Sequence, residues 1–146
     1  MKVRTSIAAA GAAVVLAGTG ALLLPAVASA HSTTHTLKFT AVQLAPQAKF
    51  SQTSFGKAEK DVSAGKVIGF DVINVELNPK TNTASGGVTL STNGGFLYGA
   101  LKLTNNPVIH GTVTGGTGTF KGATGTITAK PLSKTQTAVT VTYTTP

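Results

Sequence analysis

The side chain best placed to do chemistry is Asp71, which lies in the alternating segment 67–77, VIGFDVINVEL. In a β-strand, alternation puts Asp71 on the same face as Ile73 and Val75. A carboxylate on an apolar face is costly to bury unless it serves a partner or a ligand. The pattern therefore predicts a polar anchor or a general base at a ligand pocket. Two alternatives stay open, a bulge that turns Asp71 outward and a structural hydrogen bond to loop amides.

Three further side chains are candidates for contact with a ligand. His110 lies in a second alternating segment, and its imidazole titrates near neutrality, which suits proton transfer. The alternative for His110 is an outward or core position without chemistry. Tyr98 and Tyr143 alternate onto apolar faces, where their rings would line a core or a pocket and their hydroxyl groups would reach a ligand. With Asp71, these residues form the predicted ligand-binding set.

The composition excludes several kinds of catalytic site. The 146 residues include no cysteine, so zinc sites and iron–sulfur clusters built from thiolates are excluded. No Ser-His-Asp set has a suitable spacing, and four acidic residues leave little for hydrolytic acid–base work. His31 and His35 are too few ligands for a tight metal site. The sequence therefore predicts no metal and no cofactor, and it assigns no catalytic residue.

The segment 107–130, PVIHGTVTGGTGTFKGATGTITAK, reads as a strand, a glycine-rich corner and a second strand. It is not a P-loop, because Lys121 is followed by Gly122 and not by Ser or Thr. It is not a dinucleotide fingerprint either, because residues 124–130 alternate as a strand where a helix would have to begin. The predicted structural signature consists of Gly115, Gly116, Gly118, Phe120, Gly122 and Gly125.

The sequence of this corner, GTVTGGTGTFKGATGTIT at 111–128, resembles the signature of the allene oxide cyclase/dirigent superfamily, in particular that of its small secreted bacterial members. A looser match in spacing runs over residues 62–143. The resemblance implies an antiparallel eight-stranded β-barrel that often forms trimers and holds a hydrophobic ligand or a reactive intermediate. In the plant members the work is stereochemical, a guided ring closure or an oriented radical coupling. Their pocket residues cannot be carried over, since this chain has neither Arg nor Cys after residue 30.

The hydrophobic pattern predicts seven or eight short strands and no convincing helix. Strands are expected at 37–42, 49–55, 67–77, 88–91, 96–103, 108–113, 124–130 and 136–144. Phe50 is expected in the core, 56–65 is expected to be an exposed loop, and Asn93-Gly94 predicts a type I′ hairpin turn. Strand spacing of about ten residues indicates a sandwich or a barrel. We predict the barrel, because closure removes exposed edges.

Residues 1–30 have the pattern of a secretory signal peptide. Lys2 and Arg4 precede a long apolar run, and the small residues at 28–30 form a cleavage site. An uncleaved membrane anchor is the alternative, although glycines and a proline interrupt the run. The predicted organisation is therefore a signal peptide at 1–30, a flexible tail at 31–36 and a barrel domain at 37–146. The predicted location is secreted, that is, extracellular.

Removal of the signal peptide leaves ten lysines against four acidic residues. Nucleic-acid readers use arginine for bidentate contacts, and the lysines here are scattered without interleaved aromatic residues. We therefore predict no nucleic-acid partner, and no membrane partner after cleavage. The lysines are expected to form a solvated surface, with weak attraction to anionic cell-wall polymers as the alternative.

Three functions are compatible with these patterns. The first is binding of a small hydrophobic molecule inside the barrel, without covalent chemistry. The second is a cyclase-like or isomerase-like enzyme that confines a reactive intermediate by shape and a few polar contacts. The third is a surface-acting structural protein, or one that binds cell walls or carbohydrate, through lysines or through threonine ladders such as 124–128. A homo-oligomer, in particular a trimer, is the predicted partner arrangement.

Overall fold

The computed structural model describes residues 32–146, which form a single antiparallel sheet of nine strands and one short helix. The elements in chain order are β1 (Thr33–Gln43), β2 (Ala48–Lys49), β3 (Ser54–Ser63), β4 (Lys66–Asn78), β5 (Thr83–Thr92), β6 (Gly95–Leu103), β7 (Ile109–Gly116), the 3₁₀ helix η1 (Gly118–Phe120), β8 (Thr124–Pro131) and β9 (Gln136–Thr145). Within this range no helix has the length and apolarity to cross a membrane.

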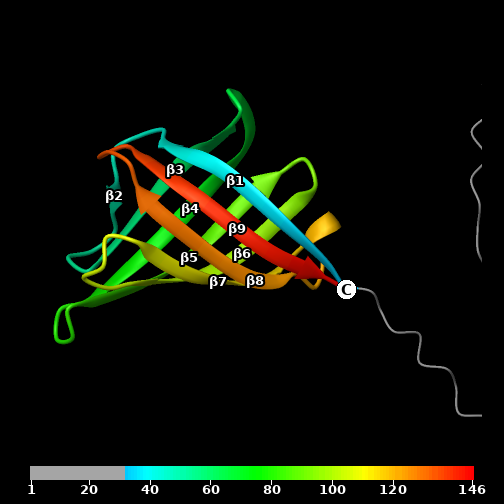
Figure 1. The fold of residues 1–146 in the computed structure, drawn as a ribbon. Coiled ribbons are helices and arrows are strands. Elements are labelled where there is room, and N and C mark those ends of the chain that lie inside the picture. The colour runs from blue at the N-terminus through cyan, green and yellow to red at the C-terminus, as the bar shows by residue number, and fades with distance from the viewer. Residues whose placement is uncertain (1–31) are drawn as a thin grey trace, which may run out of the picture.

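The sheet closes on itself, as Figure 1 shows. Strands β3 to β9 pair in chain order, β9 pairs with β1, and β1 returns to pair with β3. The short β2 pairs only with the start of β3, so the barrel wall has eight strands. The predicted antiparallel eight-stranded barrel is confirmed. The predicted signal peptide at 1–30 lies outside the described residues.

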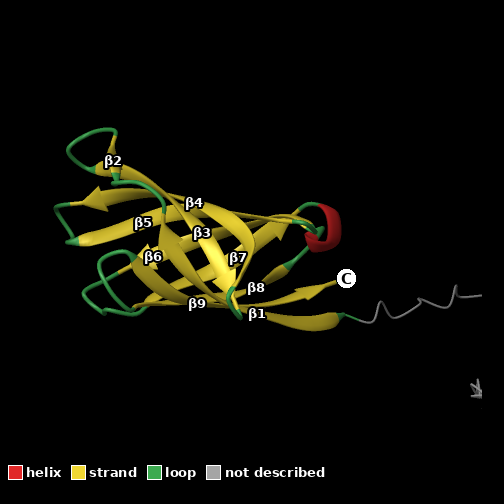
Figure 2. Ribbon diagram, turned by 90° about the horizontal axis from the view of Figure 1, so that it is seen from above, coloured by secondary structure: helices red, strands yellow, loops and turns green. Residues whose placement is uncertain are grey.

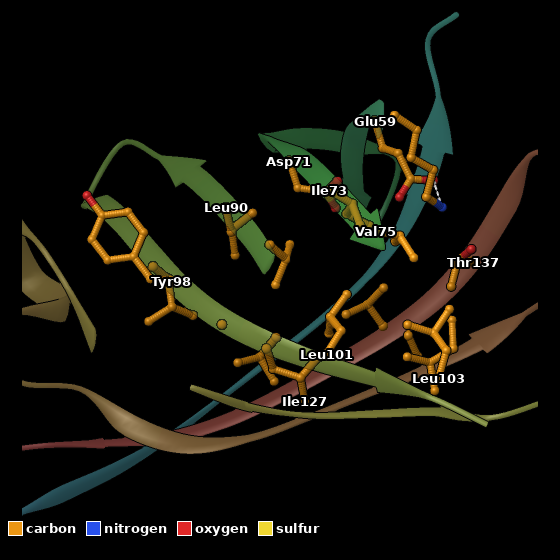
Figure 3. A pocket seen from close by; sticks show the side chains of 18 of the residues that line it. Glu59, Asp71, Ile73, Val75, Leu90, Tyr98, Leu101, Leu103, Ile127 and Thr137 are labelled. Atoms are coloured by element: carbon orange, nitrogen blue, oxygen red, sulfur yellow. Dashed lines mark ion pairs between the residues drawn. The ribbon is translucent and has the colours of Figure 1, made fainter. Parts of the chain in front are cut away.

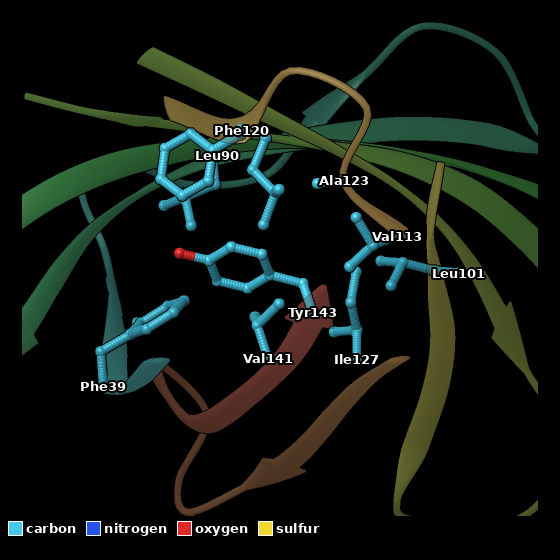
Figure 4. Close-up of a cluster of buried hydrophobic side chains, with 11 residues drawn as sticks. Phe39, Leu90, Leu101, Val113, Phe120, Ala123, Ile127, Val141 and Tyr143 are labelled. Carbon is cyan, nitrogen blue, oxygen red and sulfur yellow. The ribbon is translucent and has the colours of Figure 1, made fainter. Parts of the chain in front are cut away.

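One end of the barrel is filled by side chains. Phe120 of η1 turns inward and meets the ring of Tyr143 edge to face, with 5.4 Å between ring centroids (Figure 4). Ala123 and Val113 complete this cluster, which is almost wholly buried. Figure 2 shows η1 at this end of the barrel and β2 at the opposite end. These side chains close this end of the barrel, and we call the cluster the plug.

The glycine signature builds this plug. Gly118 adopts a φ of 59°, a left-handed conformation in which a Cβ is strained, and a side chain there would also strike the carbonyl of Gly94. Gly125 lies against the main chain of Thr142, so only a residue without a side chain fits between β8 and β9. The main-chain N–H of Thr119 donates to Gly94 O at 2.9 Å, which ties the corner to the neighbouring hairpin. The corner is architectural, as its sequence predicts.

The N-terminal end of the domain differs from its prediction. Residues 31–36 were expected to be a flexible tail, but β1 begins at Thr33 and is paired with β9 from its first residue. Thr34 lies opposite Thr144, and His35 stacks on Tyr143 with 5.2 Å between ring centroids. The TTHT sequence lacks an apolar alternation because this part of β1 extends past the core. Backbone pairing with β9 holds this part of β1 in the strand conformation.

The segment 56–65 was expected to be an exposed loop, and this prediction was wrong. It forms most of β3, a full wall strand paired with both β1 and β4. The hydrophobic pattern is missing because its inward side chains are charged. Phe50 was expected in the core but is 67% exposed in the turn between β2 and β3. A lone aromatic residue without alternating neighbours is a weak indicator of burial.

The hairpin at Asn93-Gly94 forms between β5 and β6, but without the predicted turn type. The positive φ falls at Gly95, because Gly94 is held by its contacts with the corner. The turn with two positive φ angles in succession lies between β3 and β4, at Ala64 (48°) and Gly65 (76°). That pair has the conformation of a type I′ turn.

Candidate functional site

The interior of the barrel contains a cavity of about 210 Å³. Aliphatic side chains from six strands form most of its wall (Figure 3). They are Ile73, Val75, Val88, Leu90, Leu97, Leu101, Leu103, Ile109, Ile127, Ala129, Val139 and Val141. Phe39 and Phe55 add two aromatic rings, and Gly99 leaves room where a side chain would otherwise meet Ile127. This lining suits an apolar molecule.

Strand β3 brings charged groups into this apolar space. Alternation points Lys57, Glu59 and Asp61 inward, in order from the β2 end of the barrel toward the plug. The exposed fraction falls along the series, from 23% for the Lys57 side chain to 2% for Glu59 and 0% for Asp61. The polar groups therefore lie on one wall, and the deepest of them are sealed from solvent.

Lys57 and Glu59 form an ion pair inside the barrel. Lys57 Nζ lies 2.9 Å from Glu59 Oε1, and the dashed line in Figure 3 marks this contact. Because Lys57 is partly exposed, its charge remains in contact with water while it neutralises a carboxylate below it. The positive charge of Lys57 therefore compensates the negative charge of Glu59.

Strand β4 supplies Asp71 directly across from Glu59. Asp71 is 4% exposed, borders the cavity and lies opposite Leu90 of β5. With both aspartates ionised, both carboxylate oxygens of Asp61 and Oδ1 of Asp71 find no hydrogen-bond donor among residues 32–146. A buried acceptor without a donor costs free energy, so this pair favours a state in which one carboxyl carries a proton.

The pKa values of the two aspartates reflect this environment. Burial, followed by the charges of Asp61 and Glu59, raises the pKa of Asp71 to about 8. Burial also raises the pKa of Asp61 to about 6, although a hydrogen bond from Asp71 opposes that rise. Asp71 is therefore the proton-bearing partner at neutral pH, and Asp61 is the acceptor. A carboxylic acid that holds its proton at neutral pH can both donate a hydrogen bond and give up a proton.

The structure places the four predicted ligand-binding residues in different surroundings. Asp71 points into the cavity, as its alternation indicates, whereas His110 lies on the outer surface between Lys102 and Thr128. Tyr98 borders the cavity only from the wall, because its side chain is 39% exposed and its ring lies outside (Figure 3).

Tyr143 is buried in the plug, where burial raises the pKa of its hydroxyl group. It does not belong to the cavity wall within the described chain. Asp71 is thus the one member of the predicted set whose side chain faces the cavity in residues 32–146. Its role toward a ligand stays a prediction.

Lys57, Glu59 and Asp61 were not among the residues predicted to contact a ligand. One signal was present, since Lys57, Glu59 and Asp61 lie two residues apart and so share one face of a strand. Lys60 places a further charge on the other face, so the sequence alone does not indicate which face is turned inward. Across residues 32–146, no three histidine, aspartate or glutamate side chains are arranged to hold a metal ion.

The outer wall of the barrel has two contrasting faces. Several of the exposed residues on β4 and β6 are large and apolar, and Phe70 and Phe96 lie in one row across Ser91. We call this the apolar strip; it consists of Val67, Phe70, Val72, Phe96 and Tyr98. On β1 and β7 to β9 most of the outward residues are threonines, which pair across the strands in rows. We call this the threonine face; it consists of Thr34, Thr36, Thr112, Thr124, Thr126, Thr128, Thr140, Thr142 and Thr144.

Comparison with solved structures places the barrel among known folds. A structure of pyocyanin demethylase superimposes with a TM-score of 0.64 at 13% sequence identity, over 75% of this chain and 99% of that one. A pterocarpan synthase dirigent protein superimposes with a TM-score of 0.51 at 20% identity, over 77% of this chain and 84% of that one. The fold is an allene oxide cyclase/dirigent-like barrel. The resemblance read from the glycine corner is confirmed at the level of fold, and identities this low show the fold alone.

The other two comparisons give no relatives. No family model matches the chain, and no curated protein matches it.

Proposed function

We propose that this protein is a secreted carrier or receptor that binds a small, largely apolar molecule inside the barrel. The observation that carries the proposal is the apolar cavity of about 210 Å³ with Glu59 and Asp71 on one wall. An apolar protein cavity of about 150 Å³ is large enough to bind benzene. The space here suits a molecule of one or two rings, and the polar wall would fix its orientation.

Two of the structural neighbours are named for small molecules, a pyocyanin demethylase and a pterocarpan synthase dirigent protein. The shared barrel supports a similar use of the interior here, although it does not transfer either activity. Secretion is supported by the signal-peptide pattern of residues 1–30.

The test is native mass spectrometry on the protein recovered from its own culture medium. The expected result is a mass excess that disappears on denaturation. The mass of the denatured chain should equal that of residues 31–146, as cleavage before His31 predicts. Val139→Trp fills the cavity from β9, so it should abolish the excess mass. Thr140→Trp adds the same group one residue away on the outer face and should retain it.

A bare wild-type chain that also takes up no apolar probe, such as naphthalene, would contradict the binding proposal. Equal loss of ligand in Val139→Trp and Thr140→Trp would show that the effect comes from misfolding and not from the cavity.

The second candidate is an isomerase or cyclase, and the Asp61–Asp71 pair favours it. A buried carboxyl group with a pKa of about 8 can deliver and recover a proton without leaving the cavity. Isomerisation leaves the mass of a ligand unchanged, so the molecule released from the barrel should be incubated with fresh protein and followed by chromatography. A new peak that wild type produces and Asp71→Asn does not would establish turnover; an unchanged ligand would leave a binding protein.

The threonine face favours the third candidate, a surface-acting protein. The hydroxyl groups of Thr36, Thr142, Thr126 and Thr112 form one row, repeated at the strand spacing of about 4.8 Å. Such a row could contact a regular polymer. Retention on insoluble cell-wall material that is lost in Thr126→Lys and kept in Val139→Trp would support this candidate over the cavity.

A further inference from the structure

The wall of the cavity carries more negative than positive groups. Three carboxyl groups face the interior, those of Glu59, Asp61 and Asp71. Lys57 is the cation that faces it in the described part of the chain, and it is engaged by Glu59 at 2.9 Å. The Asp61–Asp71 pair is therefore left with no cation of its own in residues 32–146.

The other residues around Asp71 supply no positive charge in residues 32–146. Across it on β5 lies Leu90, and across Asp61 on β1 lies Ala41. The lining residues that β1 and β5 to β9 contribute carry no charged group in the described range. The titratable and charged groups that face Asp71 are thus Lys57, Glu59 and Asp61, all on β3.

We propose that the cavity selects an organic cation, a molecule with an apolar body of one or two rings and one positively charged nitrogen held against Asp71. This inference rests on the proposed function, since it names the class of ligand that the barrel would carry. The apolar body would lie among the aliphatic side chains, and the nitrogen would fill the position of the missing positive charge.

Three features favour this class over other ligands. Asp71 borders the cavity, and its buried Oδ1 has no hydrogen-bond donor in residues 32–146, so an N–H⁺ group in the cavity would supply the carboxyl group with a donor and a compensating charge. Phe39 and Phe55 face the same space, and aromatic rings attract cations. An anion would meet carboxyl groups on the polar wall, and a metal ion lacks a set of three ligands among the described residues.

Binding of a cation should release a proton. Asp71 holds its proton at neutral pH, because burial and neighbouring charge raise its pKa to about 8. A positively charged nitrogen favours the ionised form and would expel that proton. The affinity for a cation should therefore increase with pH, by up to about tenfold per pH unit below the pKa of Asp71.

The experiment uses three probes with one skeleton and different charge: 2-naphthylmethylamine, 2-naphthalenemethanol and 2-naphthoate. Their affinities for the secreted form of the protein are measured by titration calorimetry at about pH 6 and about pH 8. We expect the amine to bind at least about tenfold more tightly than the alcohol at the higher pH, with naphthoate weakest. Calorimetry in two buffers of different ionisation enthalpy should detect the released proton.

Two variants and a matched control locate the effect. Asp71→Asn keeps the shape of the side chain and removes its charge, so it should bring the amine to the affinity of the alcohol and abolish its pH dependence. Asp61→Asn should weaken the amine less, because Asp71 is the group that borders the cavity. Glu76→Gln removes an exposed carboxylate from the outer face of the same strand and should change neither affinity.

The outcomes separate this inference from the proposed function. If the alcohol binds as tightly as the amine at both pH values, or if Asp71→Asn keeps the preference for the amine, the cation inference is wrong and the barrel remains an apolar-ligand carrier. If none of the three probes binds, both the inference and the proposed function are overturned.

Discussion

The buried carboxyl groups of Asp61 and Asp71 make the stability of the barrel depend on pH. In the unfolded chain both titrate near 3.8, whereas in the barrel burial raises the pKa to about 6 for Asp61 and about 8 for Asp71. Between these values the unfolded chain has released protons that the folded chain still holds, so the free energy of unfolding falls as pH increases. We expect the barrel to be less stable at about pH 8 than at about pH 5 by a few kcal/mol, measured by urea unfolding.

Asp71→Asn is the variant that tests this prediction, because the amide cannot ionise. It should raise the stability at about pH 8 and flatten the decline, whereas Glu76→Gln on the solvent side of β4 should follow the wild type. A wild-type stability that rises from about pH 5 to about pH 8 would contradict the burial of these two groups.

At the scale of secondary structure, β3 is the wall strand that the hydrophobic pattern of the sequence did not predict. Strands with an apolar inward face, such as β4, β8 and β9, were predicted from their alternation to within one residue at each end. In β3 the residues that face the interior are charged, so the apolar alternation that identifies a strand is missing there. Asp71 was found because it interrupts an apolar face; Glu59 and Asp61 were missed because they share a polar one.

The two tight hairpin turns also have conformations that their residue types do not predict. Asn93-Gly94 has the residue types of a type I′ turn but is shaped by the corner packed against it, through Thr119 N–H and Gly94 O. Ala64-Gly65 adopts positive φ at both residues although alanine has no preference for it. The backbone conformation of a turn can therefore be predicted from its residue types only where no other segment packs against the turn.

This difference predicts opposite responses to substitution. Ala64→Asn introduces a residue that tolerates a positive φ, so we expect it to stabilise the barrel by roughly 0.5–1 kcal/mol in urea unfolding. Asn93→Ala should change the stability by less than about 0.5 kcal/mol, because Asn93 has an ordinary negative φ. A large loss in Asn93→Ala together with no gain in Ala64→Asn would contradict these turn conformations.

At the scale of the whole molecule, the barrel divides its surroundings into three regions with different chemistry. The interior is apolar with one acidic wall, the threonine face is polar and uncharged over most of its rows, and the apolar strip is exposed. Solvation explains the threonine face, since threonine is a favourable outward residue in strands. It does not explain the apolar strip, because Phe70 and Val67 remain more than half exposed, at 53% and 55%.

The apolar strip fits a contact between copies of the chain, and we propose that it lies at the interface of a homo-oligomer, in particular a trimer. Its five side chains expose on the order of 400 Å² of apolar surface, as much as the largest patch on a typical monomer. A stable interface buries about 800 Å² on each partner, so neighbouring residues of β4 to β6 would have to join it. Such a contact would involve the outer face of the barrel wall, whereas the cavity lies inside the barrel.

A charge in the middle of the strip tests this arrangement. Phe70→Lys would place one uncompensated ammonium group per copy in the interface, so the variant should be monomeric by native mass and sedimentation while the wild type is oligomeric. Thr126→Lys adds the same charge on the threonine face and should leave the oligomer intact. Dissociation in Thr126→Lys but not in Phe70→Lys would move the interface to the threonine face, and a monomeric wild type would leave the apolar strip for a different partner. Because the cavity lies inside each barrel, the monomeric Phe70→Lys should still carry whatever ligand the wild type carries.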